Sequence, residues 1–272
     1  MLTALAPILL MQVGIAPTAA PVSAVPPELR DRPARNAPMP DRAAAQPAIE
    51  VCLQTARTDP ARARAIAEEW TARTAGVQRA AGQHCLGVAA ANAGDWRAAS
   101  DAFIAAREGA TDGRFRARMG ALAGSALLAQ DRAKDALRIL DASALEAAGE
   151  PELAGAIAMD RASALIALDR TQDAATALSA ARAAVPGDAH AWLLSATLAR
   201  RDGDLASAQS WIEEAARRDP RDPTIGLEAG VIAALGQRDD AARRSFQSVV
   251  ETAPDSAEAA AARQYLAQLA GG

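Results

Sequence analysis

Three prolines at regular intervals constrain this chain more than any other feature of its sequence. Pro186, Pro220 and Pro254 follow one another at intervals of 34 residues, and the segments that they close repeat one pattern. Each segment has small residues at its eighth and twentieth places and a bulky residue at its twenty-fourth. The three copies are residues 155–188, 189–222 and 223–256. Such a period is typical of stacked supersecondary units, so we expect a repeat architecture rather than a single central core.

The small residues at fixed places predict pairs of closely packed helices. Two antiparallel helices can approach only where their facing side chains are small, and the bulky twenty-fourth residue fills the space that remains. Gly203, between Asp202 and Asp204, supplies the positive φ that the turn needs, and each closing proline ends a second helix. Because no hairpin buries its own apolar stripe, the hairpins must stack.

Two earlier segments, which begin at Ala80 and Ala117, follow the same register less strictly. Each has glycine at its eighth place and a bulky residue at its twenty-fourth. The spacing between their twentieth-place alanines and the next lengthens to 37 and then 38 residues. We therefore expect short insertions around Gly109–Gly113 and Ala148–Glu152, in loops between hairpins, where extra length is tolerated.

Further helices are expected at both ends of the array. Residues 48–58 and 61–74 form one more predicted helix pair, with Pro60 at the first position of its second helix. Trp70 is expected to cover the exposed end. Residues 256–270 predict a final amphipathic helix, which suits the solubilising cap that a repeat array requires.

The whole pattern resembles the tetratricopeptide repeat, whose period is about 34 residues. The resemblance covers residues 48–270 and is most specific over 155–254. It implies an all-α fold, a right-handed α-solenoid of about five hairpins with N- and C-terminal capping helices. Composition agrees, because 50% of residues are hydrophobic but only 3% are aromatic. A core of alanine and leucine favours close-packed helices over a sheet.

The first 47 residues differ from the rest. Leu2–Ala16 is an apolar run without charge, shorter than the roughly 20 residues of a membrane span. With small residues at 22–24, it predicts a signal peptide over residues 1–24, although no lysine or arginine precedes the run. An uncleaved anchor or a buried N-terminal helix is the alternative. The proline-rich residues 25–47 are predicted to be a disordered linker.

The two cysteines of the chain, Cys52 and Cys85, are 33 residues apart, almost one repeat. They occupy near-equivalent places on neighbouring first helices, whose axes would lie about 8–10 Å apart. In an exported protein this predicts a disulfide; the alternative is two free, buried thiols. His84 stands beside Cys85, but no Cys-x-x-Cys or His-x-x-x-His spacing supports a metal site. We expect no metal or other cofactor.

No motif for catalysis or for nucleic-acid binding is present. The sequence has no Gly-x-Ser-x-Gly and no glycine-rich phosphate loop. The carboxylates of Glu68-Glu69 and Glu213-Glu214 are adjacent on predicted helices, so the two side chains of each pair diverge. Basic residues are scattered among acidic ones rather than gathered in a stripe. We expect a protein that is not an enzyme and that binds no nucleic acid.

The family resemblance implies a binding surface. In tetratricopeptide repeat proteins the first helices line a concave groove that commonly binds peptides or partner proteins, and the second, fifth, ninth and twelfth places of a repeat face it. The residues that we assign to this groove are Arg118, Met159, Ser163, His190, Leu193, Thr197, Arg200 and Leu227. The lysine and asparagine clamp of chaperone-tail binders is not matched. A mostly apolar lining instead favours an apolar helix or an extended segment.

These expectations converge on a non-catalytic scaffold or assembly factor of the bacterial cell envelope, exported to the periplasm and not stably inserted in a membrane after signal cleavage. Two alternatives stay open. One is an accessory or regulatory subunit of an envelope enzyme complex, and the other is an unexported cytosolic adaptor. Export distinguishes the cytosolic adaptor from the envelope scaffold, because only an oxidising compartment favours the bond between Cys52 and Cys85.

Overall fold

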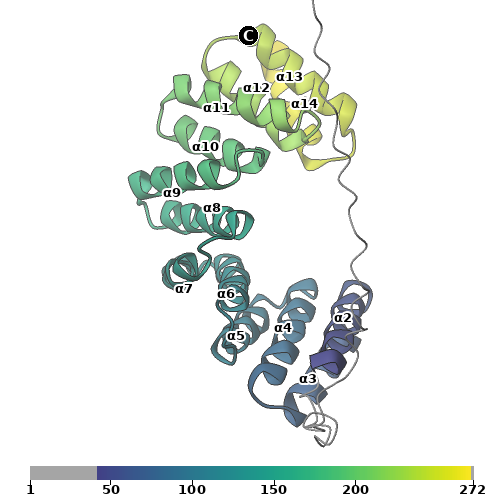
Figure 1. The fold of residues 1–272 in the computed structure, drawn as a ribbon. Coiled ribbons are helices and arrows are strands. Elements are labelled where there is room, and N and C mark those ends of the chain that lie inside the picture. Colours follow the sequence, from purple (N-terminus) through teal and green to yellow (C-terminus); the bar gives the residue numbers. More distant parts are fainter. Residues whose placement is uncertain (1–41, 271–272) are drawn as a thin grey trace, which may run out of the picture. The chain divides into compact units, whose positions relative to one another are not determined.

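The computed structural model describes residues 42–270, which form thirteen α-helices and no strand (Figure 1). The predicted signal peptide, residues 1–24, and the linker up to residue 41 lie outside the described residues. The helices are α2 (Arg42–Thr58), α3 (Pro60–Arg73), α4 (Gly76–Asn92), α5 (Trp96–Glu108), α6 (Gly113–Leu128), α7 (Ala133–Glu146), α8 (Pro151–Ala167), α9 (Thr171–Ala184), α10 (Ala189–Arg201), α11 (Leu205–Arg218), α12 (Pro223–Leu235), α13 (Asp239–Thr252) and α14 (Ala257–Ala270).

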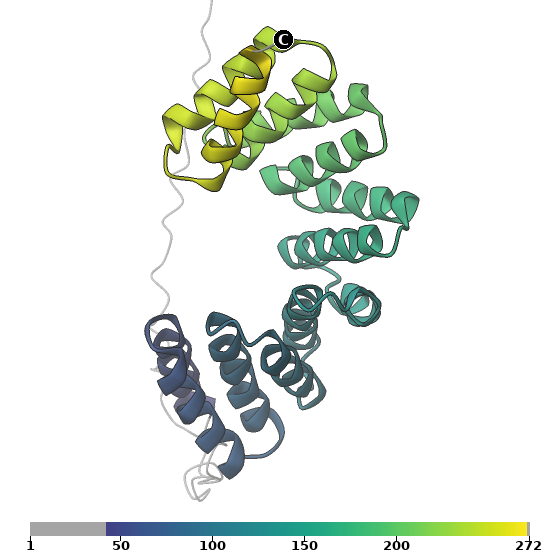
Figure 2. The same ribbon diagram turned by 180° about the vertical axis from the view of Figure 1, so that it is seen from behind.

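These helices pair into hairpins that stack in chain order. The second helix of each hairpin packs on the first helix of the next, and α14 packs on α13 and α12. Figures 1 and 2 show the hairpins side by side from opposite directions. The fold expected from the sequence is confirmed: five repeat hairpins, from α4/α5 to α12/α13, lie between the α2/α3 pair and the capping helix α14.

Helix α2 starts earlier than expected. It begins at Arg42, whereas the sequence pattern places the start of the helical domain at residue 48. The segment after Arg42 contains three consecutive alanines and a glutamine, all strong helix formers. Pro47 removes one backbone hydrogen bond from the helix but does not end it. The predicted linker is therefore shorter than 25–47, because its last six residues belong to α2.

One residue in the turn of each of the five repeat hairpins has a positive φ. These residues are Gly94 (76°), Asp131 (57°), Asp169 (57°), Gly203 (83°) and Gln237 (57°). In every case the next residue donates its N–H to the carbonyl five positions earlier, as Asp204 does to Ala199 at 2.9 Å. This is the Schellman arrangement that ends a helix. The role predicted for Gly203 is confirmed, and three repeats use a non-glycine residue for it.

The eighth and twenty-fourth places of each repeat pack against each other. A Cβ added to Gly87 would lie 2.5 Å from the ring of Phe103, which is buried. Repeats with alanine at the eighth place have leucine or isoleucine, not phenylalanine, at the twenty-fourth. The five pairs are Gly87–Phe103, Gly124–Leu140, Ala162–Leu178, Ala196–Ile212 and Gly230–Phe246. The size complementarity read from the sequence therefore sets how closely the helices of a hairpin approach.

An ion-pair cluster holds the region where the repeat spacing lengthens. Arg107, only 9% exposed, donates to the Glu146 carboxylate and to the carbonyl oxygen of Arg116 at 2.8 Å. Arg116 also pairs with Glu146, at 3.0 Å. Burial raises the pKa of Glu146, but the hydrogen bonds from the two arginines outweigh burial and hold the pKa below its usual value. The insertions expected near Gly109–Gly113 and Ala148–Glu152 do lie in loops, before α6 and before α8.

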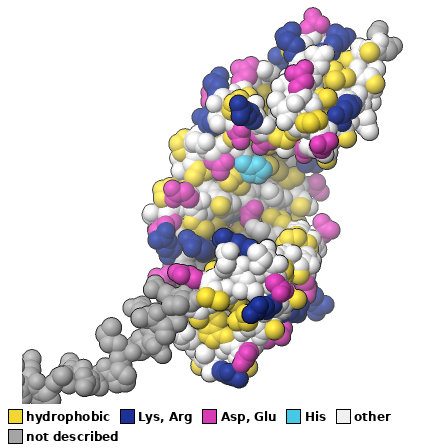
Figure 3. Space-filling view, turned by 90° about the vertical axis from the view of Figure 1, so that its right-hand side faces the viewer, with side chains coloured by type: hydrophobic (Ala, Val, Ile, Leu, Met, Phe, Trp, Pro, Cys, Tyr) yellow, Lys and Arg dark blue, Asp and Glu magenta, His cyan; other side chains and the backbone are white. Residues whose placement is uncertain are grey.

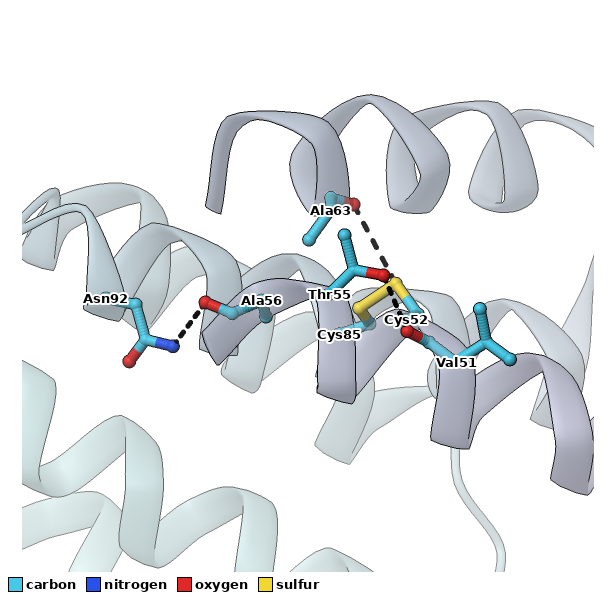
Figure 4. Close-up of a disulfide and its surroundings, with 7 residues drawn as sticks. All are labelled: Val51, Cys52, Thr55, Ala56, Ala63, Cys85 and Asn92. Atoms are coloured by element: carbon cyan, nitrogen blue, oxygen red, sulfur yellow. Dashed lines mark hydrogen bonds between the residues drawn. A yellow bond between two sulfur atoms is a disulfide. The ribbon is translucent and has the colours of Figure 1, made fainter. Parts of the chain in front are cut away.

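The N-terminal hairpin is joined to the first repeat by a disulfide. Cys52 of α2 and Cys85 of α4 are both fully buried and bonded to each other, with their Cα atoms 6.1 Å apart (Figure 4). Nearby, the Asn92 side-chain amide donates to the carbonyl oxygen of Ala56 at 2.7 Å. Because each sulfur is bonded to the other, neither can serve with His84 as a thiolate ligand.

Candidate partner-binding face

The first helices of the last four repeats form a continuous row. Helix α6 contacts α8, α8 contacts α10, and α10 contacts α12, whereas no comparable contact joins the second helices α5, α7, α9, α11 and α13. We call the solvent-facing side of this row, which carries Arg118, Ser125, Asp160 and His190, the inner face. Figure 3 views the unit from the side of Figure 1 on which this row lies and shows charged side chains and a histidine among hydrophobic ones.

The residues that the sequence assigns to the binding surface differ in their exposure in the structure. Arg118 and His190 are exposed, and five others are half-buried. The half-buried five are Met159, Ser163, Thr197, Arg200 and Leu227. Both apolar and polar side chains of α8, α10 and α12 are thus partly accessible to solvent.

Leu193 is the exception. It is only 5% exposed and belongs to the core cluster that includes Ile212 and Ile225. The neighbouring first helix α12 lies close enough to cover the fifth place of α10, so the side chain fills the junction between two repeats. In this structure Leu193 stabilises the stack and does not offer a contact surface to a partner.

Arg200 reaches the inner face but already has a partner. Its guanidinium lies 2.6 Å from the Glu228 carboxylate of the next repeat. Both side chains are less than a quarter exposed. The pair therefore links α10 to α12, and a partner protein would meet a neutral ion pair here rather than a single cation.

Asp160 is the inner-face residue that the sequence pattern does not identify. Its half-buried carboxylate in α8 accepts a hydrogen bond from the Ser125 hydroxyl in α6 and lies near His190 in α10. Burial raises the pKa of Asp160, and the hydrogen bond from Ser125 and the nearby His190 only partly oppose this effect. Three successive repeats thus meet at one carboxylate that is incompletely neutralised.

On α4, before this row, His84 is packed between aromatic rings. Its imidazole lies edge-on to Phe115, with ring centroids 5.8 Å apart, and near Phe103. Burial, together with the charge of Arg118, lowers the pKa of His84 to about 4. His84 is therefore neutral at pH 7 and acts as a packing residue between the two rings.

Asp160 and Glu228, which the sequence analysis did not assign to the site, share a position in the repeat. Asp160 and Glu228 both occupy the sixth place of their repeats, and both reach back to the preceding first helix, to Ser125 and Arg200 respectively. The family-based assignment used only places two, five, nine and twelve. A carboxylate at the sixth place is thus a mark of a polar bond between consecutive repeats.

No grouping on residues 42–270 suggests a metal centre, since no three or more His, Cys, Asp or Glu side chains there are arranged to hold an ion. Within the same residues, no helix combines the length and the apolar character needed to cross a membrane.

Comparison with known proteins agrees with this geometry. The sequence model of the tetratricopeptide repeat family matches residues 159–223 and 196–257. No curated protein matches the chain as a sequence relative. Similar solved structures include Pseudomonas aeruginosa pilF, 16% identical with a TM-score of 0.62, covering 83% of this chain and 99% of that one. PilW, a type IV pilus biogenesis factor, is 16% identical with a TM-score of 0.66 and covers 79% and 96%.

A thermophilic TPR protein of Thermus thermophilus is 18% identical, with a TM-score of 0.55, and the match covers 70% of this chain and 98% of that one. At these identities the likeness shows the fold alone. The family match falls on the repeats whose proline spacing is regular at 34 residues. Residues 159–257 therefore carry tetratricopeptide repeats, and the rest of the described chain shares the fold of such proteins.

Proposed function

We propose that this protein is a non-catalytic interaction scaffold or assembly factor that holds a segment of a partner protein on its inner face. The observation that carries the proposal is Asp160. An ionised carboxylate that is half-buried with one hydroxyl donor is costly to keep, and ionisable groups in such positions concentrate at functional sites. A partner that donates a hydrogen bond or a positive charge to Asp160 would satisfy this carboxylate.

The other partly accessible side chains of α8, α10 and α12 indicate what kind of segment would bind. Met159 and Leu227 supply apolar contact, while Ser163 and Thr197 supply hydroxyl groups on the same row of helices. A segment with apolar side chains and one lysine, arginine or other hydrogen-bond donor fits this surface. An amphipathic helix or an extended peptide can present that combination.

We further propose that the protein acts in the bacterial cell envelope. The apolar run of residues 2–16 fits a secretory signal peptide that is removed near Ala24. A buried disulfide such as Cys52–Cys85 suits an oxidising compartment. Similarity in fold to a type IV pilus biogenesis factor supports an assembly role in this location.

Site-specific crosslinking in the producing cell tests the binding face. A photoreactive residue would replace Arg118, which is exposed on the inner face, or Thr176, which is exposed on the second helix α9 and serves as the control. We expect one protein to be crosslinked from position 118, not from 176, and the yield to fall when Asp160→Asn is added. Equal yields from both positions, or none from 118, would contradict binding on the inner face.

The same sample tests the location and the nearest alternative function. Mass spectrometry of the purified protein should show an N-terminus near residue 25 and bonded cysteines. A chain that begins at Met1 with free thiols would reject export and favour a cytosolic adaptor. A crosslinked partner that is an enzyme, and whose activity changes on binding, would favour the accessory-subunit interpretation.

A further inference from the structure

Arg182, near the end of α9, is withdrawn from water without an acidic partner among the described residues. Its side chain is half-buried, and its only hydrogen bond within residues 42–270 runs from the guanidinium to the Ser195 hydroxyl of α10. Every other arginine of these residues that is buried or half-buried forms an ion pair with a carboxylate. They are Arg107, Arg116, Arg161, Arg200, Arg218 and Arg243.

This lack of a partner is unfavourable for the folded protein. Burial lowers the pKa of Arg182, and no carboxylate of the described residues opposes that effect. An arginine side chain nevertheless stays charged near neutral pH, so the folded chain keeps a partly dehydrated cation. Taking a charge out of water without an opposite charge beside it costs free energy. A ligand with a negative charge would remove this cost.

Two tryptophans hold the guanidinium of Arg182 in place. Its central carbon, Cζ, lies 4.6 Å from the centre of the Trp211 ring of α11 and 5.4 Å from that of the Trp192 ring of α10. The Trp192 indole N–H donates in turn to the Pro186 carbonyl oxygen at 3.1 Å. Both rings are half-buried and pack on the core cluster that includes Ile212. Contact with ring faces orients a guanidinium and leaves the N–H groups at its edge free to donate.

A carboxylate is the anion that suits this site. A guanidinium has five N–H donors in one plane, and a carboxylate can accept from two of them side by side. The other cation beside Trp192 is Arg218, which is already neutralised, because its guanidinium lies 2.5 Å from the Glu214 carboxylate. Arg182 alone therefore matches the single charge of an acidic side chain better than the nearly double charge of a phosphate group.

The residue types at this site are those of protein interfaces. Tryptophan and arginine are enriched among the side chains that carry most of the binding energy there. The site gathers them from three neighbouring helices, since α9 and α11 both pack on α10 (Figure 1). Arg182 and Trp211 belong to second helices, whereas the inner face is formed by first helices.

We propose that Arg182, with Trp192 and Trp211 beside it, binds an acidic side chain of a partner protein. The carboxylate of the partner accepts hydrogen bonds from the free N–H groups of Arg182, and apolar side chains next to it contact the two rings. The charge of this site is opposite to that of Asp160 on the inner face. The inference does not depend on the proposed function, because the two surfaces share none of these residues.

NMR titration of the full-length protein with a defined peptide tests the site. The peptide acetyl-Leu-Glu-Leu-amide supplies one carboxylate between apolar side chains, and acetyl-Leu-Gln-Leu-amide is the matched neutral probe. The indole N–H signals report on the rings, since the chain has only four tryptophans. We expect the glutamate peptide to shift the signals of Trp192 and Trp211 saturably and the glutamine peptide to bind about tenfold more weakly. No saturable shift, or equal binding of the two peptides, would overturn the proposal.

Matched substitutions separate this site from general charge attraction. Arg182→Gln and Arg201→Gln each remove one positive charge, but Arg201 is exposed on α10. We expect Arg182→Gln to abolish the saturable shifts and Arg201→Gln to leave them unchanged. If both variants bind the glutamate peptide equally, Arg182 is not the donor.

Arg182→Lys gives the same answer should Arg182→Gln fail to fold. Lysine keeps the charge but lacks the planar pair of donors, so we expect several-fold weaker binding of the glutamate peptide. Binding as tight as that of the unchanged protein would reject the paired hydrogen bonds.

Inorganic phosphate, added at constant ionic strength, tests the class of anion. We expect it to bind more weakly than the glutamate peptide, as judged from the same two indole signals. Phosphate binding as tight as that of the peptide, or tighter, would reject an acidic side chain as the ligand.

Discussion

At the residue scale, the turn between the two helices of each repeat carries a conformational cost in free energy. The fifteenth place of each repeat has φ between 57° and 83°, yet only Gly94 and Gly203 are glycines. An L-residue in this region loses roughly 1–2 kcal/mol, although aspartate tolerates it better than most. Gln237 is neither glycine nor aspartate. It is therefore the most strained of the five turn residues.

Gln237→Gly should stabilise the protein. The relief of left-handed strain exceeds the extra backbone entropy that glycine gives the unfolded chain, for a net gain of about 0.5–1 kcal/mol. Urea unfolding followed by circular dichroism measures this as a higher midpoint. Asp131→Gly is the control and should gain less. A lower midpoint for Gln237→Gly would show that its side chain makes a contact worth more than the strain.

Asp160→Asn should stabilise the free protein while weakening partner capture. Burial raises the pKa of Asp160, so the ionised form at pH 7 is disfavoured in the folded state. Because the folded pKa exceeds the unfolded one, stability contributed by this group increases as the pH falls through the folded pKa. The neutral amide should therefore raise the free energy of unfolding at pH 7 and remove this pH dependence.

Thermal unfolding between pH 3 and pH 8 measures the gain in stability and the loss of pH dependence in Asp160→Asn, with the exposed Asp101→Asn as control. Crosslinking from position 118 measures partner capture. Loss of stability in Asp160→Asn at pH 7 would contradict the view that this carboxylate is kept at a cost.

Glu146→Gln should have the opposite effect. The pKa of Glu146 is held below its ordinary value of 4.5, so its contribution is complete above pH 4.5 and is lost as the pH falls through the folded pKa. Removing the charge leaves the buried Arg107 unpaired. Removing one partner of a completely buried ion pair destabilises a protein by about 3–5 kcal/mol. Because Glu146 is 24% exposed, we expect Glu146→Gln to lower the free energy of unfolding by about 2–3 kcal/mol at pH 7.

This loss should shrink toward zero in acid, because Glu146 itself becomes protonated there. The free energies of unfolding of the unchanged protein and of Glu146→Gln should be compared at pH 7 and at pH 3. The control is Glu69→Gln, which removes an exposed carboxylate and should change the free energy of unfolding by no more than about 0.5 kcal/mol at either pH. An equal loss at both pH values would show that packing, not charge, is responsible.

At the scale of the helices, the two helices of each hairpin fit together through the side chains at the eighth and twenty-fourth places of the repeat. The Gly230–Phe246 pair uses the smallest residue opposite a large one, and the Ala162–Leu178 pair uses intermediate sizes. The combined volume of these two pairs is similar, so different side chains can fill the same space between the two helices of a hairpin. Helix starts are specified just as locally, since the Asp222 carboxylate accepts from the Thr224 N–H at 2.7 Å and Pro223 is the first residue of α12.

Exchange of pair members should be strongly non-additive. Gly230→Ala alone places a methyl group against the Phe246 ring and should cost about 1–3 kcal/mol. Adding Phe246→Leu recreates the alanine–leucine pair of Ala162 and Leu178 and should recover part of the loss. A double-mutant cycle by urea unfolding measures the coupling. Simple additivity would show that the two places do not set the helix separation.

The molecule as a whole is held together by contacts between neighbours, so changes at one end should stay local. Each hairpin contacts mainly the next, and the stability of such an array is a sum of repeat and interface terms. The Cys52–Cys85 disulfide is the only covalent link between described residues beyond the backbone itself. It joins α2 to α4 and so protects the end where the array would otherwise fray.

Cys52→Ser with Cys85→Ser should loosen the N-terminal hairpin without unfolding the rest. A disulfide that closes a loop of 33 residues contributes about 3–4 kcal/mol on the chain-entropy model. Hydrogen exchange should show faster exchange in α2, α3 and the start of α4, and unchanged exchange in α10–α13. A uniform increase over all helices would show that the array unfolds as one unit.

The order, pairing and turns of the helices followed from the sequence because they depend on contacts within a repeat. Spacing of small and bulky residues, turn residues such as Gly203 and the closing prolines act over fewer than about 40 residues, so a periodic pattern reveals them. The start of α2 differs from the prediction because Pro47, which belongs to the predicted proline-rich linker, does not end the helix, and the alanines on its N-terminal side sustain it.

Which side chains are accessible on the inner face was decided only by the tertiary structure. Leu193 and Arg200 occupy places that face the groove in the family, but the next repeat buries one and pairs the other with Glu228. Asp160 stands out only once α6, α8 and α10 bring Ser125 and His190 beside it. Exposure and charge at the inner face depend on how closely one repeat packs on the next. That distance is set by side chains from different repeats, far apart in the chain, which a repeat pattern does not encode.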